Sequence, residues 1–280
     1  MFREQFDKNG YVIIEDFLTE EEINELKSAG EKFSLEASTA SNQAGIFDTT
    51  SSPQSSDRYF LESGDKISYF YESGVRNEDG TLKVDPKIAL NKVGHALHWL
   101  HPTFKKITFH EKVKQVCREL DLVKPAIAQS MYIYKNPRVG SEVNTHQDAS
   151  YLYTEPPKLY GFWFALHDAT EENGCLQFIP GSHHEEVTYR FIRNPDPNSE
   201  QLCISTGAQK TKTYDDDRFK FEPVKKGSCV LIHGQVVHRS FHNSSDKPRH
   251  AYTFHVIDTH QSEYSSQNWL QAEFQSLYEN

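Results

Sequence analysis

Cysteine is scarce in this chain, with four residues among 280 and no C-x-x-C pair. This spacing excludes a zinc finger and is typical of a protein from a reducing compartment. We expect the four side chains to be small buried hydrophobic groups rather than reactive thiols. They are Cys117, Cys175, Cys203 and Cys229.

Long apolar runs and an excess of positive charge are also missing. No run approaches the roughly 18 residues of a membrane span, and a net charge of −10 gives no electrostatic footprint for nucleic acid. The first ten residues, MFREQFDKNG, lack the apolar core of a secretory signal, and the last four, LYEN, are not a peroxisomal S-K-L signal. We therefore expect a cytoplasmic protein that binds a small molecule, with neither membrane nor nucleic acid as partner.

The amino-terminal half has mainly helical patterns. A short strand is expected at residues 11–14, followed by a helix that begins at the capping box of Thr19 and Glu22. Residues 87–120 have apolar residues at helical spacing around Pro102, which predicts two helices broken at that proline.

Residues 38–57, STASNQAGIFDTTSSPQSSD, are rich in Ser, Thr and Asn, a composition that predicts a loop. A loop of this length in a compact domain is either a lid or a disordered segment. Our hypothesis is a lid that shields a site.

From about residue 126 the sequence changes to short β-branched and aromatic runs separated by Gly, Pro or Asn. The runs are AIAQSMYIYK, LYGFWFALHD, CLQFIP, GSCVLIHG, QVVHRS and RHAYTFHVI. Many short strands without intervening helices indicate a sandwich or jelly roll. We expect one domain, residues 1–280, in which a helical half of about 1–125 packs on a β core of about 126–260.

Histidine is followed two positions later by a carboxylate in three places. With 14 His and 40 Asp plus Glu in 280 residues, chance gives about two such triplets, so the triplet alone is a weak signal. The three are His146–Asp148, His183–Glu185 and His184–Glu186. The last two follow the turn IPGS and are expected in a solvated loop.

His146 and Asp148 lie between strand-like runs, and residues two apart on an extended segment share a face, with Gln147 turned away. Two His and one carboxylate on one face of an octahedron form the facial triad of non-haem iron sites. The third ligand should then be a distant His on another strand. Candidates are His233, His238, His242, His250 and His255. QVVHRS favours His238, which alternates onto one face with Ser240, and His233 is the second choice.

Arg249 follows His238 by 11 residues and begins the last expected strand. A hairpin of that length would bring its guanidinium beside the metal site. There the group could bind a carboxylate through two hydrogen bonds.

These residues resemble those of a known family. The ordered matches are NGY…FL, SGDKI, NKVGHALH, QSMYIYK, HQDASYLYTEP, ENGCLQFIPGSH, LIHGQVVH and AYTFH. Together they cover nearly the whole chain and resemble the phytanoyl-CoA dioxygenase family of Fe(II)- and 2-oxoglutarate-dependent oxygenases.

The resemblance implies a mainly β fold with flanking helices, a double-stranded β-helix (jelly roll, cupin-like) that holds iron through His146, Asp148 and His238. It also implies a set of residues for the cosubstrate 2-oxoglutarate. This set comprises Arg249 and Ser240 at the distal carboxylate, Lys92 as a second cation, Met131 and Trp163 as walls, and the triplet His146, Gln147 and Asp148.

The implied reaction converts 2-oxoglutarate and O₂ to succinate and CO₂ and hydroxylates a small organic substrate, with ascorbate as reductant. The family name suggests an acyl-CoA, but the acidic chain offers no obvious basic cradle for its phosphates. Tyr151 and Tyr153 are candidates to face the substrate.

Two alternatives stay open: another metalloenzyme on the same barrel, and an iron-binding sensor without turnover. A halogenase is disfavoured because Asp148 stands where halide would bind. An isomerase or lyase would have no use for Arg249.

Overall fold

Two β-sheets form the centre of this computed structural model, which describes residues 2–39, 44–77, 79–207 and 213–280. Within these residues the larger sheet has nine strands, in the order β1-β13-β8-β15-β5-β4-β3-β2 with β17 beside β5, and the smaller has the order β12-β9-β14-β6. The larger sheet contains β1 (Tyr11–Ile14), β2 (Ala44–Phe47), β3 (Ile67–Glu72), β4 (Leu90–His95), β5 (Pro125–Ile133), β8 (Leu159–Ala165), β13 (Cys229–His233), β15 (Ala251–Asp258) and β17 (Gln275–Ser276). The smaller contains β6 (Val143–His146), β9 (Leu176–Phe178), β12 (Lys220–Glu222) and β14 (His238–Ser240).

The two sheets share a core in which Trp163 and Ile232 of the larger sheet pack with Leu176 and Phe178 of the smaller. The central strands β8 and β15 are buried along their whole length, as their runs of aromatic and β-branched residues require. This arrangement is the predicted jelly roll. Every run expected as a strand after residue 126 contains one.

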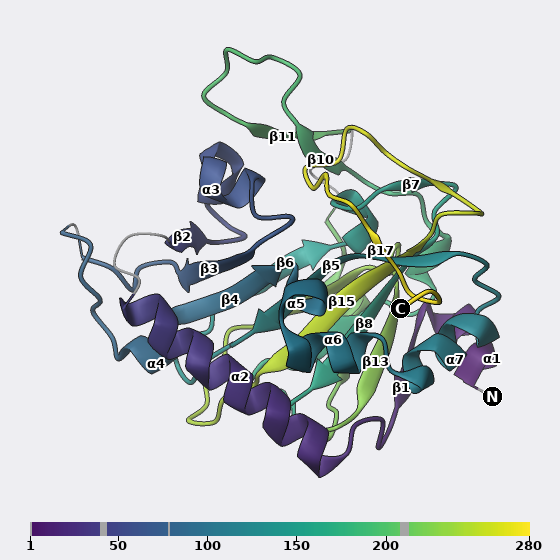
Figure 1. Ribbon diagram of the computed structural model, residues 1–280, viewed down its shortest axis with the longest axis horizontal. Helices are drawn as coiled ribbons and strands as arrows, with labels where there is room; N and C mark the ends of the chain where they lie inside the picture. The colour runs from purple at the N-terminus through teal and green to yellow at the C-terminus, as the bar shows by residue number, and fades with distance from the viewer. Residues whose placement is uncertain (1, 40–43, 78, 208–212) are drawn as a thin grey trace.

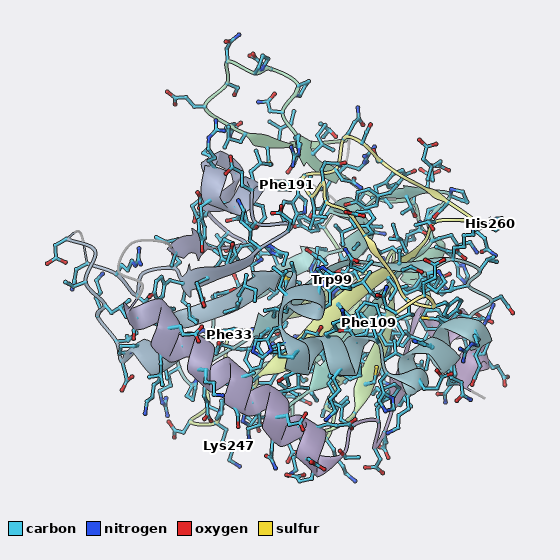
Figure 2. All side chains as sticks on the ribbon, in the orientation of Figure 1. Phe33, Trp99, Phe109, Phe191, Lys247 and His260 are labelled. Atoms are coloured by element: carbon cyan, nitrogen blue, oxygen red, sulfur yellow. The ribbon has the colours of Figure 1, made fainter. Side chains whose placement is uncertain are left out.

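Helices cover the outer face of the larger sheet (Figure 1). The longest, α2, runs across the sheet, and Figure 2 places Phe33, Trp99 and Phe109 on this helical side. The helices are α1 (Phe2–Asn9), α2 (Glu20–Thr39), α3 (Arg58–Leu61), α4 (Pro86–Ala89), α5 (Leu97–Leu100), α6 (Pro102–Thr108) and α7 (Glu111–Glu119). The predicted capping box is confirmed, because the Thr19 N–H donates to the Glu22 carboxylate at 2.8 Å and the Glu22 N–H to the Thr19 hydroxyl at 3.2 Å.

Residues 87–120 were predicted as two helices, and this prediction is wrong for their first part. Leu90–His95 forms β4, which pairs antiparallel with β3 and β5. This short run becomes a strand because it is buried between two neighbouring strands. The spacing of its apolar residues does not predict a strand. The predicted break at Pro102 is confirmed, because α5 ends at Leu100 and Pro102 is the first residue of α6, where proline is favoured.

The expectation of a continuous loop at residues 38–57 is also wrong. Residues 40–43 lie outside the described part, but Ala44–Phe47 forms β2, which pairs parallel with β3, and a 3₁₀ helix spans Pro53–Ser56. The amino-terminal half is therefore only partly helical. Because its four strands belong to the same sheet as the core strands, we propose that residues 1–280 form one domain.

Among the described residues, three further 3₁₀ helices and four further short strands lie in the connections. They are Asp148–Ser150, Ser182–His184 and Asp216–Arg218, with the pairs β7 (Thr154–Glu155) and β16 (Glu263–Tyr264), and β10 (Arg190–Arg193) and β11 (Cys203–Thr206). All four cysteines are buried and free, as predicted. Among the described residues, no helix combines the length and the apolar character that crossing a membrane requires.

The contact between α2 and the sheet depends on a helical glycine. A Cβ on Gly30 would lie 2.2 Å from Cζ of Tyr132, a fully buried side chain whose hydroxyl is bonded to His250 at 3.0 Å.

We expect Gly30→Ala to destabilise the protein, because overpacking costs about 1–3 kcal/mol and outweighs the roughly 1 kcal/mol that alanine contributes to a helix. Urea unfolding measures the change. Ser28→Ala, on an exposed position of the same helix, is the control, and an equal stability of both variants would contradict the prediction.

Candidate functional site

A cavity of about 930 Å³ opens between the two sheets. Both sheets contribute to its wall, the larger through Met131, Trp163 and Thr253 and the smaller through His146 and His238. The pocket therefore lies inside the jelly roll, where side chains from distant parts of the sequence meet.

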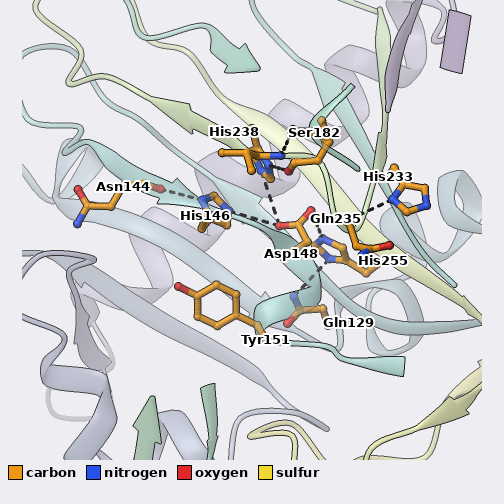
Figure 3. A network of polar contacts seen from close by, with 12 residues as sticks. Gln129, Asn144, His146, Asp148, Tyr151, Ser182, His233, Gln235, His238 and His255 are labelled. Carbon is orange, nitrogen blue, oxygen red and sulfur yellow. Dashed lines mark hydrogen bonds and ion pairs between the residues drawn. The ribbon is translucent and has the colours of Figure 1, made fainter. Parts of the chain in front are cut away.

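His146, Asp148 and His238 converge at this pocket (Figure 3). One ligand atom from each lies within 4.8 Å of the other two, and within the described residues no other group of three His, Cys, Asp or Glu side chains meets this criterion. The antiparallel pairing of β14 with β6 places His238 directly opposite His146. Asp148 follows the end of β6 and begins a 3₁₀ helix. The choice of His238 over His233 is thus supported by register.

The two imidazoles present the same nitrogen to the centre of the site. Nδ1 of His146 donates to the carbonyl of Asn144 at 2.8 Å, and Nδ1 of His238 donates to the carbonyl of Val236 at 3.1 Å. This leaves both Nε2 lone pairs free toward Asp148, which is how neutral histidines bind metals. Burial lowers the pKa of His238 to about 4, so this ring is neutral at physiological pH.

Asp148 lies among three imidazoles. Its Oδ1 is 3.4 Å from Nε2 of His146 and 3.7 Å from Nε2 of His238, and its Oδ2 is 3.1 Å from Nε2 of His255. Burial alone would raise the pKa of this carboxyl, but the neighbouring imidazoles lower it more. The pKa of Asp148 therefore lies well below its usual value. The group is therefore an ionised carboxylate, ready to bind a cation.

Arg249 lies at the far wall of the pocket with only part of its guanidinium paired. Nε donates to the carbonyl of Gly174 and Nη2 to the hydroxyl of Ser240, both at 3.2 Å, whereas the buried Nη1 has no partner among the described residues. Its Cζ lies 5.3 Å from the Trp163 ring centroid. Burial lowers the pKa of Arg249 to about 10, so the group stays charged. An orphaned donor of this kind fits a bound carboxylate.

Lys92 is a further cation of the pocket and is buried on β4, in a run that was predicted to be helical. Its Nζ lies 3.3 Å from the centroid of the Phe47 ring and about 5.5 Å from those of Phe60 and Phe70. Burial lowers the pKa of Lys92 to about 7. Within the described residues no carboxylate pairs with it, so a bound anion would relieve the cost of burying this charge.

The remaining predicted residues divide into two groups. Met131, Trp163, Ser240 and Tyr151 line the pocket. The Gln147 side chain turns away from the pocket, as its position between His146 and Asp148 predicted: it donates to the carbonyl of Gln235 at 2.8 Å and accepts from the N–H of Thr188 at 3.0 Å. It therefore braces the segment between these two residues and does not line the pocket, unlike the cosubstrate role that the resemblance implied for it.

The other sequence candidates do not line the pocket, namely His183, His184, His233, His242, His250 and Tyr153. His183 was expected in a solvated loop, and this is wrong: it is buried against Gly10, with Nε2 3.1 Å from the carbonyl of Asp7. His184 is exposed. The His233 ring lies 5.2 Å from that of His183, and Tyr153 hydrogen-bonds Glu155.

Sequence reasoning missed His95 and Gln129, which also line the pocket, and considered His255 only as a ligand. Each lies on a strand of the larger sheet, and β15 lies between β8 and β5, which places His255 beside Gln129. Only the pairing of strands, which short runs do not specify, could have identified them.

Two imidazoles, one carboxylate and two buried cations that pair with no carboxylate among the described residues form a donor set for a divalent metal together with a dianionic ligand. The match to protein families agrees with this chemistry. The model of the family described as "Phytanoyl-CoA dioxygenase (PhyH)" matches residues 6–251.

The chain belongs to the phytanoyl-CoA dioxygenase family. It is 42% identical to the phytanoyl-CoA dioxygenase domain-containing protein 1 homolog of Caenorhabditis elegans, over 99% of this chain and 98% of the relative. It is 43% identical to the phytanoyl-CoA dioxygenase domain-containing protein 1 of Danio rerio, over 98% and 97% of the two chains. The predicted resemblance and the assignment as an oxidoreductase of this family are confirmed.

The fold is shared with solved non-haem enzymes. The crystal structure of the epimerase SnoN in complex with Fe³⁺, α-ketoglutarate and nogalamycin RO superposes with a TM-score of 0.60 at 16% identity, over 94% of this chain and 84% of that one. At this identity the likeness supports the jelly-roll fold alone.

The triad geometry predicts that loss of any one ligand removes metal binding. We expect His146→Ala, Asp148→Ala and His238→Ala each to weaken Co(II) binding by more than the roughly 10–100-fold that an outer partner contributes. Isothermal titration without O₂ measures the affinity. The control is His233→Ala, which removes a histidine outside the triad, and a triad variant with unchanged affinity would contradict the assignment.

Proposed function

We propose that this protein is an Fe(II)- and 2-oxoglutarate-dependent dioxygenase that hydroxylates a small organic substrate. The observation that carries the proposal is the orphaned Nη1 of Arg249 in the same buried pocket as the triad. A metal-only binding protein would gain nothing from a buried guanidinium with a free donor. The iron and α-ketoglutarate named for SnoN support the same pair of ligands here.

His146, Asp148 and His238 would hold the iron, and Arg249 with Ser240 would hold the distal carboxylate of 2-oxoglutarate. When bound, the metal and cosubstrate supply oxidation by O₂, with release of succinate and CO₂. Met131 and Trp163 would form the walls of the cosubstrate chamber and exclude water from it. Lys92 would provide a second positive charge for the dianion.

Beyond the triad, the pocket continues along aromatic side chains. The Tyr151 ring lies 6.0 Å from that of His146 and 5.7 Å from that of Phe191, and Phe60 stacks on Trp269 at 4.3 Å. These rings provide an apolar surface for a substrate beside the metal. The acidic net charge gives no support for an acyl-CoA, so we propose a small organic substrate without fixing its class.

The structure of the epimerase SnoN contains α-ketoglutarate, so this cosubstrate is also found with an enzyme that is not named as a hydroxylase. We infer that the presence of Arg249 favours an enzyme that uses a cosubstrate over a sensor or a cosubstrate-free enzyme. It does not by itself indicate whether the reaction is a hydroxylation or another oxidation. The presence of Asp148 still disfavours a halogenase. Ascorbate as reductant and a cytoplasmic location stay predictions.

Succinate release tests the function. We expect the wild-type protein with Fe(II), ascorbate and 2-oxoglutarate to form succinate even without the natural substrate, and Asp148→Ala to form none. Arg249→Ala should raise the KM for 2-oxoglutarate about 10–100-fold, since a hydrogen bond to a charged group contributes about 1.5–3 kcal/mol, and high cosubstrate should partly restore turnover. Lys92→Met should raise the KM as well.

The control for these variants is Arg118→Ala, which removes a surface arginine paired with Glu111. Equal succinate release by wild type, Asp148→Ala and Arg249→Ala would reject the dioxygenase assignment.

We also propose that residues 44–57, which belong to the predicted lid of residues 38–57, close the pocket. Thr49, Ser52 and Ser55 line it, and the Asn144 amide donates to the carbonyl of Thr49 at 3.0 Å. Asn144 is the residue whose carbonyl holds His146. The segment is thus tied to β6, the strand that carries His146.

Limited proteolysis tests the lid. We expect cleavage within residues 48–57 to slow when Mn(II) and 2-oxoglutarate are both present, because a filled pocket favours the closed segment. Cleavage in the loop 79–85, which does not line the pocket, is the internal reference. An unchanged ratio of the two cleavage rates would count against a lid.

A further inference from the structure

The two oxygens of the Asp148 carboxylate have different surroundings. Oδ1 lies toward His146 and His238, the two imidazoles of the triad, whereas Oδ2 lies 3.1 Å from Nε2 of His255 on β15. Figure 3 shows His255 on the opposite side of the carboxylate from the triad imidazoles. One oxygen is therefore directed to the metal position and the other to a protein donor.

The contacts of His255 with Asp148 and with Gln129 have a defined direction. A carboxylate oxygen accepts, so Nε2 of His255 carries the hydrogen. Nδ1 of His255 then accepts from the amide nitrogen of Gln129, which lies 3.3 Å away. His255 and Gln129 are 5% and 6% exposed, so water does not compete for these bonds.

The neighbouring strand leaves room for this pair. Gly161 is the one residue of β8 that has no side chain, and it pairs with His255 on β15. A Cβ built on Gly161 would lie 3.5 Å from Oδ2 of Asp148 and 3.6 Å from Nε2 of His255. The carboxylate and imidazole thus meet over the one position of β8 that has no side chain.

We propose that His255, oriented by Gln129, is a positioning residue that commits Oδ2 of Asp148 and leaves Oδ1 alone for the metal. This inference rests on the proposed metal site. Its consequence is a carboxylate that contributes one ligand atom, so that three coordination positions stay open for the cosubstrate and O₂. A carboxylate free to rotate could offer both oxygens to the ion and occupy one of those positions.

Two substitutions at the same position separate hydrogen bonding from packing. His255→Gln keeps an N–H that can reach Oδ2, and His255→Phe keeps an aromatic ring but has no donor. We expect His255→Phe to weaken Co(II) binding about 10–100-fold, as is typical when an outer partner of a metal ligand is lost, and to change the visible spectrum of the Co(II) protein. His255→Gln should stay within a few-fold of wild type and keep the wild-type spectrum.

Gln129→Leu should fall between the two, because it removes the group that orients His255. The matched control is His98→Ala, which removes another buried imidazole, bonded to the Ser130 hydroxyl at 2.8 Å. We expect it to leave Co(II) affinity unchanged. Thermal unfolding checks that each variant is folded, and His255→Leu replaces His255→Phe if the larger ring prevents folding.

The reverse order, with His255→Phe binding Co(II) as tightly as wild type and His255→Gln more weakly, would assign His255 to packing and overturn the proposal. Equal affinity of all His255 variants and wild type would also overturn it. Asp148→Ala distinguishes this failure from that of the proposed function. If Asp148→Ala still binds Co(II) tightly, the metal site itself is wrong; if it does not, only the positioning role fails.

Discussion

The antiparallel pairing of β14 with β6 is the contact on which the whole site depends. It sets His238 opposite His146, and because side chains alternate along a strand, a shift by one residue would turn one imidazole away from the other. Each of the two rings is then fixed by a bond from Nδ1 to a carbonyl two residues earlier in its own segment. A short ladder between two short strands thus determines both the separation and the tautomer of two ligands.

Burial of the charged side chains of the pocket is unfavourable for the stability of the protein. Arg249 and Lys92 are buried, and within the described residues neither pairs with a carboxylate. Burial of an unpaired cation is unfavourable, and the lowered pKa of Lys92 reflects this. The long buried strands β8 and β15 and the tight contact of α2 at Gly30 supply the apolar packing that offsets it. Function and stability therefore make opposite demands on the same sheet.

Sequence reasoning predicted the β core and the triad because their signals are local. The runs after residue 126 have strand composition, and His146 and Asp148 share a face by spacing alone. His238 needed the alternation of QVVHRS and the resemblance to a family. Lys92 was placed by resemblance, but its setting was mispredicted, since the run LNKVGH becomes a strand only because β3 and β5 flank it. The partnership of His255 with Asp148 depends on the order of three strands in space, which no local pattern contains.

The two uncompensated cations also link occupancy to folding. A dianion that enters the pocket would bind the native chain and would have no such site in the unfolded chain. By mass action it would therefore raise the free energy of unfolding in proportion to the logarithm of its concentration. On the proposed function, the protein would then be least stable when its organic acid is scarce. The supply of this acid would affect the stability of the fold as well as the turnover.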